Sequence, residues 1–150
     1  MEFGKRVVIA VDIAKEARGR FDELKEIHFS SGSDVHLVYV FQEIGFNFAI
    51  DAYSMAYPLA DDRLAIEKSV NDALKKIGRE VLPKDVKVHT HCIFSENQKE
   101  KLCEVVEEIK ADVVILAARK RHGIFESSFA QYMLKHSERN LLILKDRQSV

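Results

Sequence analysis

A run of four basic residues is the feature of this sequence best suited to binding a ligand. It follows a short apolar run and precedes Gly123, where a strand is expected to give way to a turn. Cationic side chains hold anions through charge-assisted hydrogen bonds. The run could therefore hold an anion, and the plainer alternative is a basic turn that only faces solvent. The four residues are Arg119, Lys120, Arg121 and His122.

A second group of potential ligands lies in the middle of the chain. His89 and His91 are two residues apart and would share one face of a strand, whereas Cys92 would point to the other face. Structural zinc sites use four protein ligands and catalytic sites three. Two histidines do not complete such a site, so we expect no metal.

Two serines could be modified or could shape the backbone. Ser127 and Ser128 stand at the start of a predicted helix. A phosphate there would be tolerated, because a helix N-terminus favours negative charge. The plainer alternative is that either serine only caps the helix.

Sequence motifs of catalysis are absent. The chain contains no G-x-S-x-G elbow, no Walker-type loop and no H-E-x-x-H pair. No nucleophile and base can be paired, and a fold does not by itself imply chemistry. We therefore expect that the protein is not an enzyme.

The basic run belongs to a predicted strand–turn–helix–strand unit over Asp112–Lys145. Val113–Ala117 is rich in β-branched residues and suits a strand buried on both faces. Apolar residues then recur at helical spacing from Phe129 to His136, and Leu141–Leu144 is a second strand. Such a unit is a parallel crossover. Ligands of these sheets bind at the carboxyl ends of the strands, which draws attention to the turn over Ala118–His122.

Three further strands are predicted before this unit. Arg6–Val11 and Val35–Phe41 are largely apolar, which indicates central or well-covered strands. Val86–Cys92 alternates between apolar and polar residues, which indicates an edge position.

Three further helices alternate with those strands. The pattern predicts Ile13–Phe29, Leu64–Leu82 and a helix that starts at a capping box made by Ser95 and Gln98. The remaining stretch, Gln42–Pro58, is aromatic and suits a flap over the sheet or a surface for a partner. Strict alternation predicts an α/β fold, a doubly wound parallel sheet with helices on both faces.

Composition excludes several protein classes. The 150 residues fit one domain, over 1–150, and the net charge of −1 argues against binding nucleic acid. The apolar runs are too short for membrane insertion, and the N-terminus lacks a signal-peptide layout, so we expect a cytoplasmic protein. Cys92 and Cys103, the only cysteines, do not make a disulfide framework.

Three segments resemble the universal stress protein family. They are RVVIAVD at the start, SENQKEKLCEVVEEIKADVVILAA in the middle, and SSFAQYMLKHSERNLLILK near the end. Together they carry the resemblance across nearly the whole chain. It implies a five-stranded doubly wound sheet with strand order 3-2-1-4-5, and commonly a homodimer.

One branch of that family binds ATP through a glycine-rich turn after strand four, with the pattern G-x2-G-x9-G followed by Ser or Thr. Glycines there let backbone N–H groups approach the phosphates. Here Ala117 and Lys120 stand at the first two glycine positions, and Ser127 stands at the third when the helices are aligned. The nucleotide-binding loop is thus degenerate, and the chain is closest to the branch that does not bind ATP.

The resemblance also points to two residues near the ends of the first two strands. In ATP-binding members, the position of Asp12 accepts from the purine amino group and that of Val40 supplies backbone contacts to the base. Asp12 could equally cap the next helix, and Val40 could be plain core. Ile13 replaces a small residue after the aspartate.

Two functions follow as hypotheses. The first is a cytoplasmic stress-response or regulatory protein that acts as a homodimer through interactions with an unidentified protein partner, without tight ATP binding and without a cofactor. The alternative is a small-molecule binder that holds a nucleotide, such as ATP or AMP, or another anion at the turn after strand four. An open cleft beside that turn would favour the alternative.

The last strand offers a surface for dimerisation. In the order 3-2-1-4-5 it is an edge strand, whose backbone lacks partners on one side. Pairing with its copy in a second subunit would satisfy that edge and close at two subunits. The edge residues are Leu141, Leu142, Ile143 and Leu144.

Overall fold

The computed structural model describes residues 2–3, 5–11, 22–43, 60–121 and 124–146. The predicted loop Gln42–Pro58 and the first half of the helix predicted over Ile13–Phe29 fall largely outside these ranges. None of the helices within them is long and apolar enough to cross a membrane.

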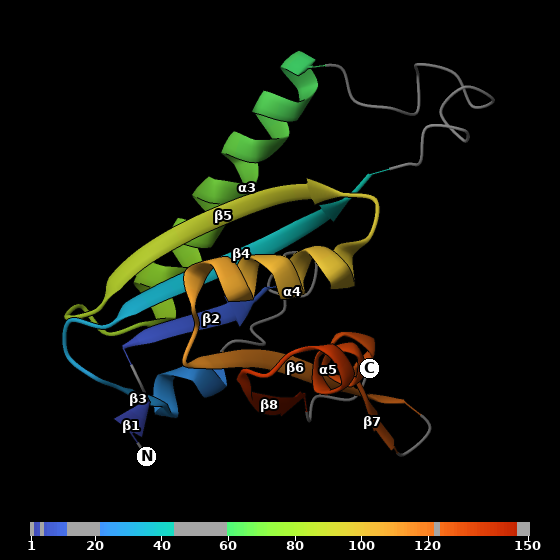
Figure 1. The fold of residues 1–150 in the computed structure, drawn as a ribbon. Coiled ribbons are helices and arrows are strands. Elements are labelled where there is room, and N and C mark those ends of the chain that lie inside the picture. Colours follow the sequence, from blue (N-terminus) through green and yellow to red (C-terminus); the bar gives the residue numbers. More distant parts are fainter. Residues whose placement is uncertain (1, 4, 12–21, 44–59, 122–123, 147–150) are drawn as a thin grey trace.

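Five parallel strands form the centre of the molecule (Figure 1). Their spatial order is β5 (Lys87–Ser95), β4 (Asp34–Gln42), β2 (Arg6–Ala10), β6 (Val113–Arg121) and β8 (Asn140–Asp146). This is the order 3-2-1-4-5, so the predicted doubly wound sheet is confirmed. The central strand β2 is buried from Val7 to Ile9, as its unbroken apolar run predicted.

Helices cover both faces of this sheet. On one face α3 (Ala60–Val81) packs Leu74, Ile77 and Val81 against the strands. On the other face α4 (Gln98–Ile109) and α5 (Ser128–His136) lie beside each other, and Met133 of α5 is fully buried. The strands β2, β4, β6 and β8 therefore contribute alternate side chains to two separate cores, as a two-residue period requires.

The first predicted helix is wrong at its end. Asp22–Glu26 forms a short 3-10 helix, η1, and His28–Phe29 forms strand β3, which pairs in parallel with β1 (Glu2–Phe3). Leu24 and Phe29 are buried. Pairing with the distant N-terminus and burial of these two side chains override the helical periodicity.

The fourth strand of the predicted order also differs from expectation. β6 does not stop at Ala117 but continues to Arg121, and it pairs there with the antiparallel strand β7 (Ile124–Glu126). A polar sequence can continue a strand when a partner strand supplies the hydrogen bonds. The predicted basic turn is thus mostly the end of a strand.

Candidate functional site at the carboxyl edge of the sheet

The candidate site lies where β4, β2 and β6 end. Val40 is two residues from the end of β4 and is 7% exposed, and Ala118 in β6 is 5% exposed. Both side chains therefore belong to the core, and only their backbone could serve a ligand. Asp12, predicted to face the same crevice, lies outside the described residues.

The backbone carbonyl of Val40 already has a partner. The Nε2 amide of Gln98, in the first turn of α4, donates a hydrogen bond to this carbonyl over 2.8 Å. Two residues earlier in β4, the carbonyl of Val38 also accepts a hydrogen bond, from the N–H of Val11, which directly follows β2. The Gln98 side chain thus supplies the hydrogen bond that a longer β2 would have donated to Val40. Sequence reasoning missed this contact, because 58 residues separate the two groups.

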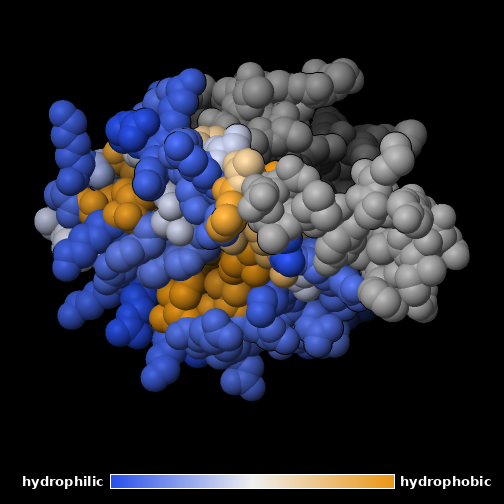
Figure 2. All heavy atoms as spheres, turned by 90° about the horizontal axis from the view of Figure 1, so that it is seen from above, coloured by the Kyte–Doolittle hydropathy of each residue, from blue (hydrophilic) through white to orange (hydrophobic). Residues whose placement is uncertain are grey.

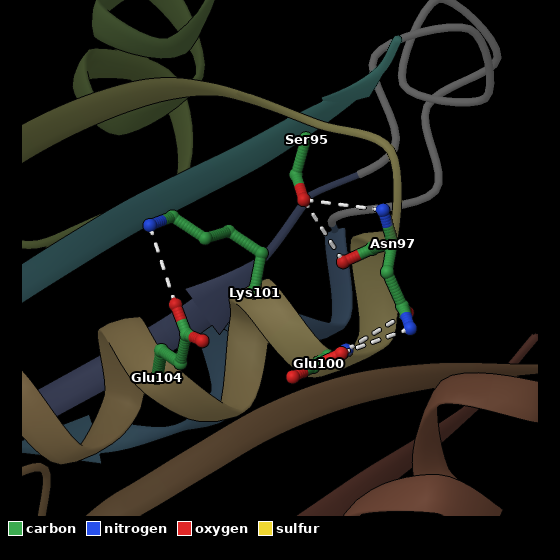
Figure 3. Close-up of polar contacts among 5 residues, drawn as sticks. All are labelled: Ser95, Asn97, Glu100, Lys101 and Glu104. Carbon is green, nitrogen blue, oxygen red and sulfur yellow. Dashed lines mark hydrogen bonds and ion pairs between the residues drawn. The ribbon is translucent and has the colours of Figure 1, made fainter. Parts of the chain in front are cut away.

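Polar contacts at the start of α4 set where this helix begins (Figure 3), and Gln98 is its first residue. Asn97, not Ser95, is the N-cap: its Oδ1 accepts from the N–H of Glu100, and its Nδ2 donates to the carboxylate of Glu100. The Ser95 hydroxyl instead accepts from the N–H of Asn97 and donates to its carbonyl. The capping box predicted for Ser95 and Gln98 is therefore wrong by two residues, and this shift frees the Gln98 amide for Val40.

The segment predicted to hold an anion has a paired backbone. Arg119, Lys120 and Arg121 are in register with Glu126, Phe125 and Ile124 of β7. Those of their N–H and C=O groups that face β7 therefore belong to a ladder, and the others point to the opposite side, whereas a phosphate-binding turn presents successive free N–H groups to one point. His122 lies outside the described residues.

The two serines open α5 as the plainer interpretation predicted. Ser127 is the N-cap, and its Oγ accepts from the N–H of Ala130 over 3.1 Å. Ser128 is the first helical residue and is exposed. Capping explains the presence of Ser127 without a bound ligand.

An aromatic and ionic cluster stands at the ends of β4 and β5. Arg63 of α3 forms an ion pair with Glu43, and its guanidinium lies 4.5 Å from the ring centroid of Phe94. Phe94 in turn contacts Phe41 at 5.3 Å between centroids. The sequence offers no local signal for this group, because three elements contribute to it.

The two histidines considered as metal ligands belong to a larger group than expected. His36 and Asp34 of β4 join His89 and His91 of β5. Among the described residues, no three His, Cys, Asp or Glu side chains are arranged to hold a metal ion. Neither cysteine favours a reactive thiolate, because burial raises the pKa of Cys92 to about 11 and also raises the pKa of Cys103.

The predicted dimer edge forms part of β8. Its four apolar residues divide between the faces, with Leu141 packed against the α4 and α5 side and with Leu142 and Leu144 packed against the α3 side. Ile143 is 37% exposed. Within the described part of the chain, β8 pairs with β6 and with no other strand.

Solved structures of several proteins share this fold. The hypothetical protein MJ0577 superposes with a TM-score of 0.72 at 15% identity, covering 97% of this chain and 98% of its own. A universal stress protein in complex with cAMP gives 0.56 at 16% identity, with 96% and 98% covered. The universal stress protein from Archaeoglobus fulgidus in complex with dAMP gives 0.53 at 14% identity, with 94% and 98% covered.

At such low identities, these structural similarities show only that the fold is shared. Comparison of the sequence itself shows the family. No curated protein matches the chain significantly. Residues 4–145, however, match the description of the universal stress protein family. A match of that extent, together with the fold just described, shows that the chain belongs to the universal stress protein family.

Proposed function

We propose that this universal stress protein is a cytoplasmic regulatory protein that acts as a homodimer through protein interactions, without tight ATP binding and without enzymatic activity. The observation that carries the proposal is the hydrogen bond from Gln98 to the Val40 carbonyl. A carboxamide N–H donates there as the amino group of a purine would. A base that uses the same carbonyl has to displace this amide or share the carbonyl oxygen with it.

The backbone after strand four supports the same proposal. Residues Arg119–Arg121 pair with β7, so those of their N–H groups that face β7 serve the ladder. A triphosphate needs several free donors at one place, and breaking ladder hydrogen bonds to provide them costs free energy. At the carboxyl edge of the sheet, the chain's own groups therefore bind backbone atoms at Val40 and at Arg119–Arg121.

Calorimetric titration with Mg-ATP and with AMP tests this proposal. We expect dissociation constants weaker than about 1 mM for the wild type. Gln98→Ala releases the Val40 carbonyl and should bind AMP more tightly than the wild type does. Gln131→Ala, which removes an exposed amide on α5, is the matched control and should bind as the wild type does. Micromolar affinity of the wild type for Mg-ATP would contradict the proposal.

The second candidate is binding of a nucleotide or another anion, and it is favoured by the complexes of two structural neighbours with cAMP and dAMP. In this case the affinity measured in the same titrations should depend on the basic residues after strand four. The double variant Arg119→Ala/Arg121→Ala would then lose roughly ten- to a hundredfold in affinity, as expected for charged hydrogen bonds. Unchanged affinity would place the anion elsewhere.

A further inference from the structure

Three histidines stand side by side on the outermost strand pair of the sheet. His36 on β4 is in register with His89 on β5, and His91 follows two residues later on the same face. The ring centroids of His36 and His89 are 4.5 Å apart, and those of His36 and His91 are 5.1 Å apart. His36 is therefore enclosed between the two histidines of the edge strand.

One hydrogen atom joins two of these rings. Nδ1 of His36 and Nε2 of His91 are 2.8 Å apart, which is hydrogen-bond distance. One nitrogen must donate and the other must accept through its lone pair. The pair can therefore carry one extra proton, but two protonated rings would turn N–H groups toward each other and break the contact.

The third ring is held by a carboxylate. Nε2 of His89 lies 2.9 Å from Oδ1 of Asp34, and this hydrogen bond lowers the pKa of Asp34. Of the other charged groups that act on the cluster, Lys87 and Arg6 are both cationic. A positive charge on His89 is thus balanced by Asp34, whereas one on His36 meets no second anion in the part of the chain that the structure describes.

Stacking of the rings distinguishes this cluster from a metal centre. The planes of His36 and His89 differ by 16°, and those of His36 and His91 by 21°. Metal-binding imidazoles instead direct their nitrogens toward one common point. The arrangement suits proton exchange between neighbouring rings and a carboxylate.

We propose that His36, His89 and His91 form a proton-operated latch, which fastens the edge strand β5 to β4 at neutral pH and loosens it in mild acid. Among the described strands, β5 pairs only with β4, so as an edge strand it can loosen without breaking the pairing of the central strands. The surface seen from the β5 side of Figure 1 carries hydrophobic patches among hydrophilic side chains (Figure 2). Loosening of β5 would change this surface.

The direction of the pH effect follows from proton binding in the two states. Burial, followed by the neighbouring histidine charges, lowers the pKa of His36 from 6.5 to about 4, and burial lowers the pKa of His91. Between pH 6.5 and about pH 4, His36 is protonated in the unfolded chain but neutral in the folded protein, so the unfolded chain binds more protons. The stability is thus fully present above the unfolded pKa and is lost as the pH falls through 6.5 toward about 4.

Urea unfolding at about pH 7.5 and about pH 5 tests the latch, since few ordinary carboxylates titrate in that range. We expect the unfolding constant of the wild type to rise between the two pH values on the order of tenfold more than that of His36→Gln. His28→Gln, at an exposed histidine of β3, is the matched control and should behave as the wild type does. Equal pH dependence of the wild type and His36→Gln would overturn the proposal.

Measurements on the wild type keep the test decisive if His36→Gln fails to fold. Histidine NMR titration should show the imidazolium of His36 losing its extra proton, to become neutral imidazole, near pH 4. Amide hydrogen exchange, corrected for its intrinsic pH dependence, should accelerate in Val88–Cys92 at about pH 5 while Val7–Ile9 stay protected. His91→Gln should reduce this local acceleration. A His36 pKa near 6.5, or uniform acceleration in all strands, contradicts a latch.

Discussion

At the scale of single residues, two neighbouring amides decide what the carboxyl edge of the sheet can do. Asn97 caps α4 and sets where the helix begins, and Gln98, one position later, reaches the Val40 carbonyl. If α4 began two residues earlier, as a cap at Ser95 requires, Gln98 would be the third helical residue instead of the first, and its side chain would point in a different direction. The helix cap is therefore part of the candidate site.

The first prediction at this scale concerns that cap. Asn97→Ala removes the acceptor for the N–H of Glu100 and should reduce the free energy of unfolding by about 1 kcal/mol. Urea unfolding measures the change. Glu96→Ala, at the exposed position just before the cap, is the control and should shift stability by less than about 0.5 kcal/mol. Equal effects of the two substitutions would show that Asn97 does not cap the helix.

At the scale of elements, α3 lies so close to the sheet that one position has almost no room for a side chain. A Cβ atom added at Gly78 would stand 3.1 Å from Cγ1 of Val88 on β5 and 3.5 Å from Cδ1 of Leu37 on β4. Glycine in a helix interior costs about 1 kcal/mol relative to alanine. Close packing of α3 on the edge strand therefore explains a residue that helix propensity disfavours.

A double-mutant cycle tests this contact. In a Val88→Ala background the space opens, and Gly78→Ala should then stabilise the protein by about 1 kcal/mol through helix propensity. In the wild-type background the same change should be less favourable, because Val88 has to move. Thermal or urea unfolding of the four proteins gives the coupling. A coupling of zero would mean that the helix and the strand are farther apart than described.

At the scale of the whole molecule, the two edges of the sheet differ. β5 is rich in histidine and other polar residues, whereas β8 presents mostly leucine and isoleucine. Apolar edge strands without charges are prone to pair with another strand. The proposed homodimer therefore uses β8, in a two-fold contact that leaves the His36 latch at the opposite edge of each subunit.

The dimer prediction is tested by sedimentation at micromolar protein concentration. The wild type should have the mass of two chains, and Leu142→Pro, which removes a backbone donor from β8, should shift the protein toward the monomer. Leu142→Ala is the control that loses side-chain packing but keeps the backbone donor. A monomeric wild type, or a folded Leu142→Pro protein that remains fully dimeric, would contradict the prediction.

The sequence by itself determined that the protein is a parallel α/β sheet and which of its strands are central, whereas the order 3-2-1-4-5 came from the resemblance to the family. Unbroken apolar runs such as Val7–Ile9 indicate burial on both faces, and the polar alternation in Val88–Cys92 indicates an edge. Each of these patterns reflects the burial of its own segment, so it can be interpreted without knowing which other residues the segment contacts. The helix Ala60–Val81, with its strong amphipathic period, was predictable for the same reason.

Tertiary structure alone decided the contents of the candidate site. Gln98 meets Val40, and His36 meets His91, only because strands and helices distant in sequence come together. The histidine cluster had a signal, since neighbouring parallel strands each carry histidine on one face. The continuation of β6 through Arg121 had none, because hydrogen bonds from β7 hold a polar segment extended whatever its own propensity.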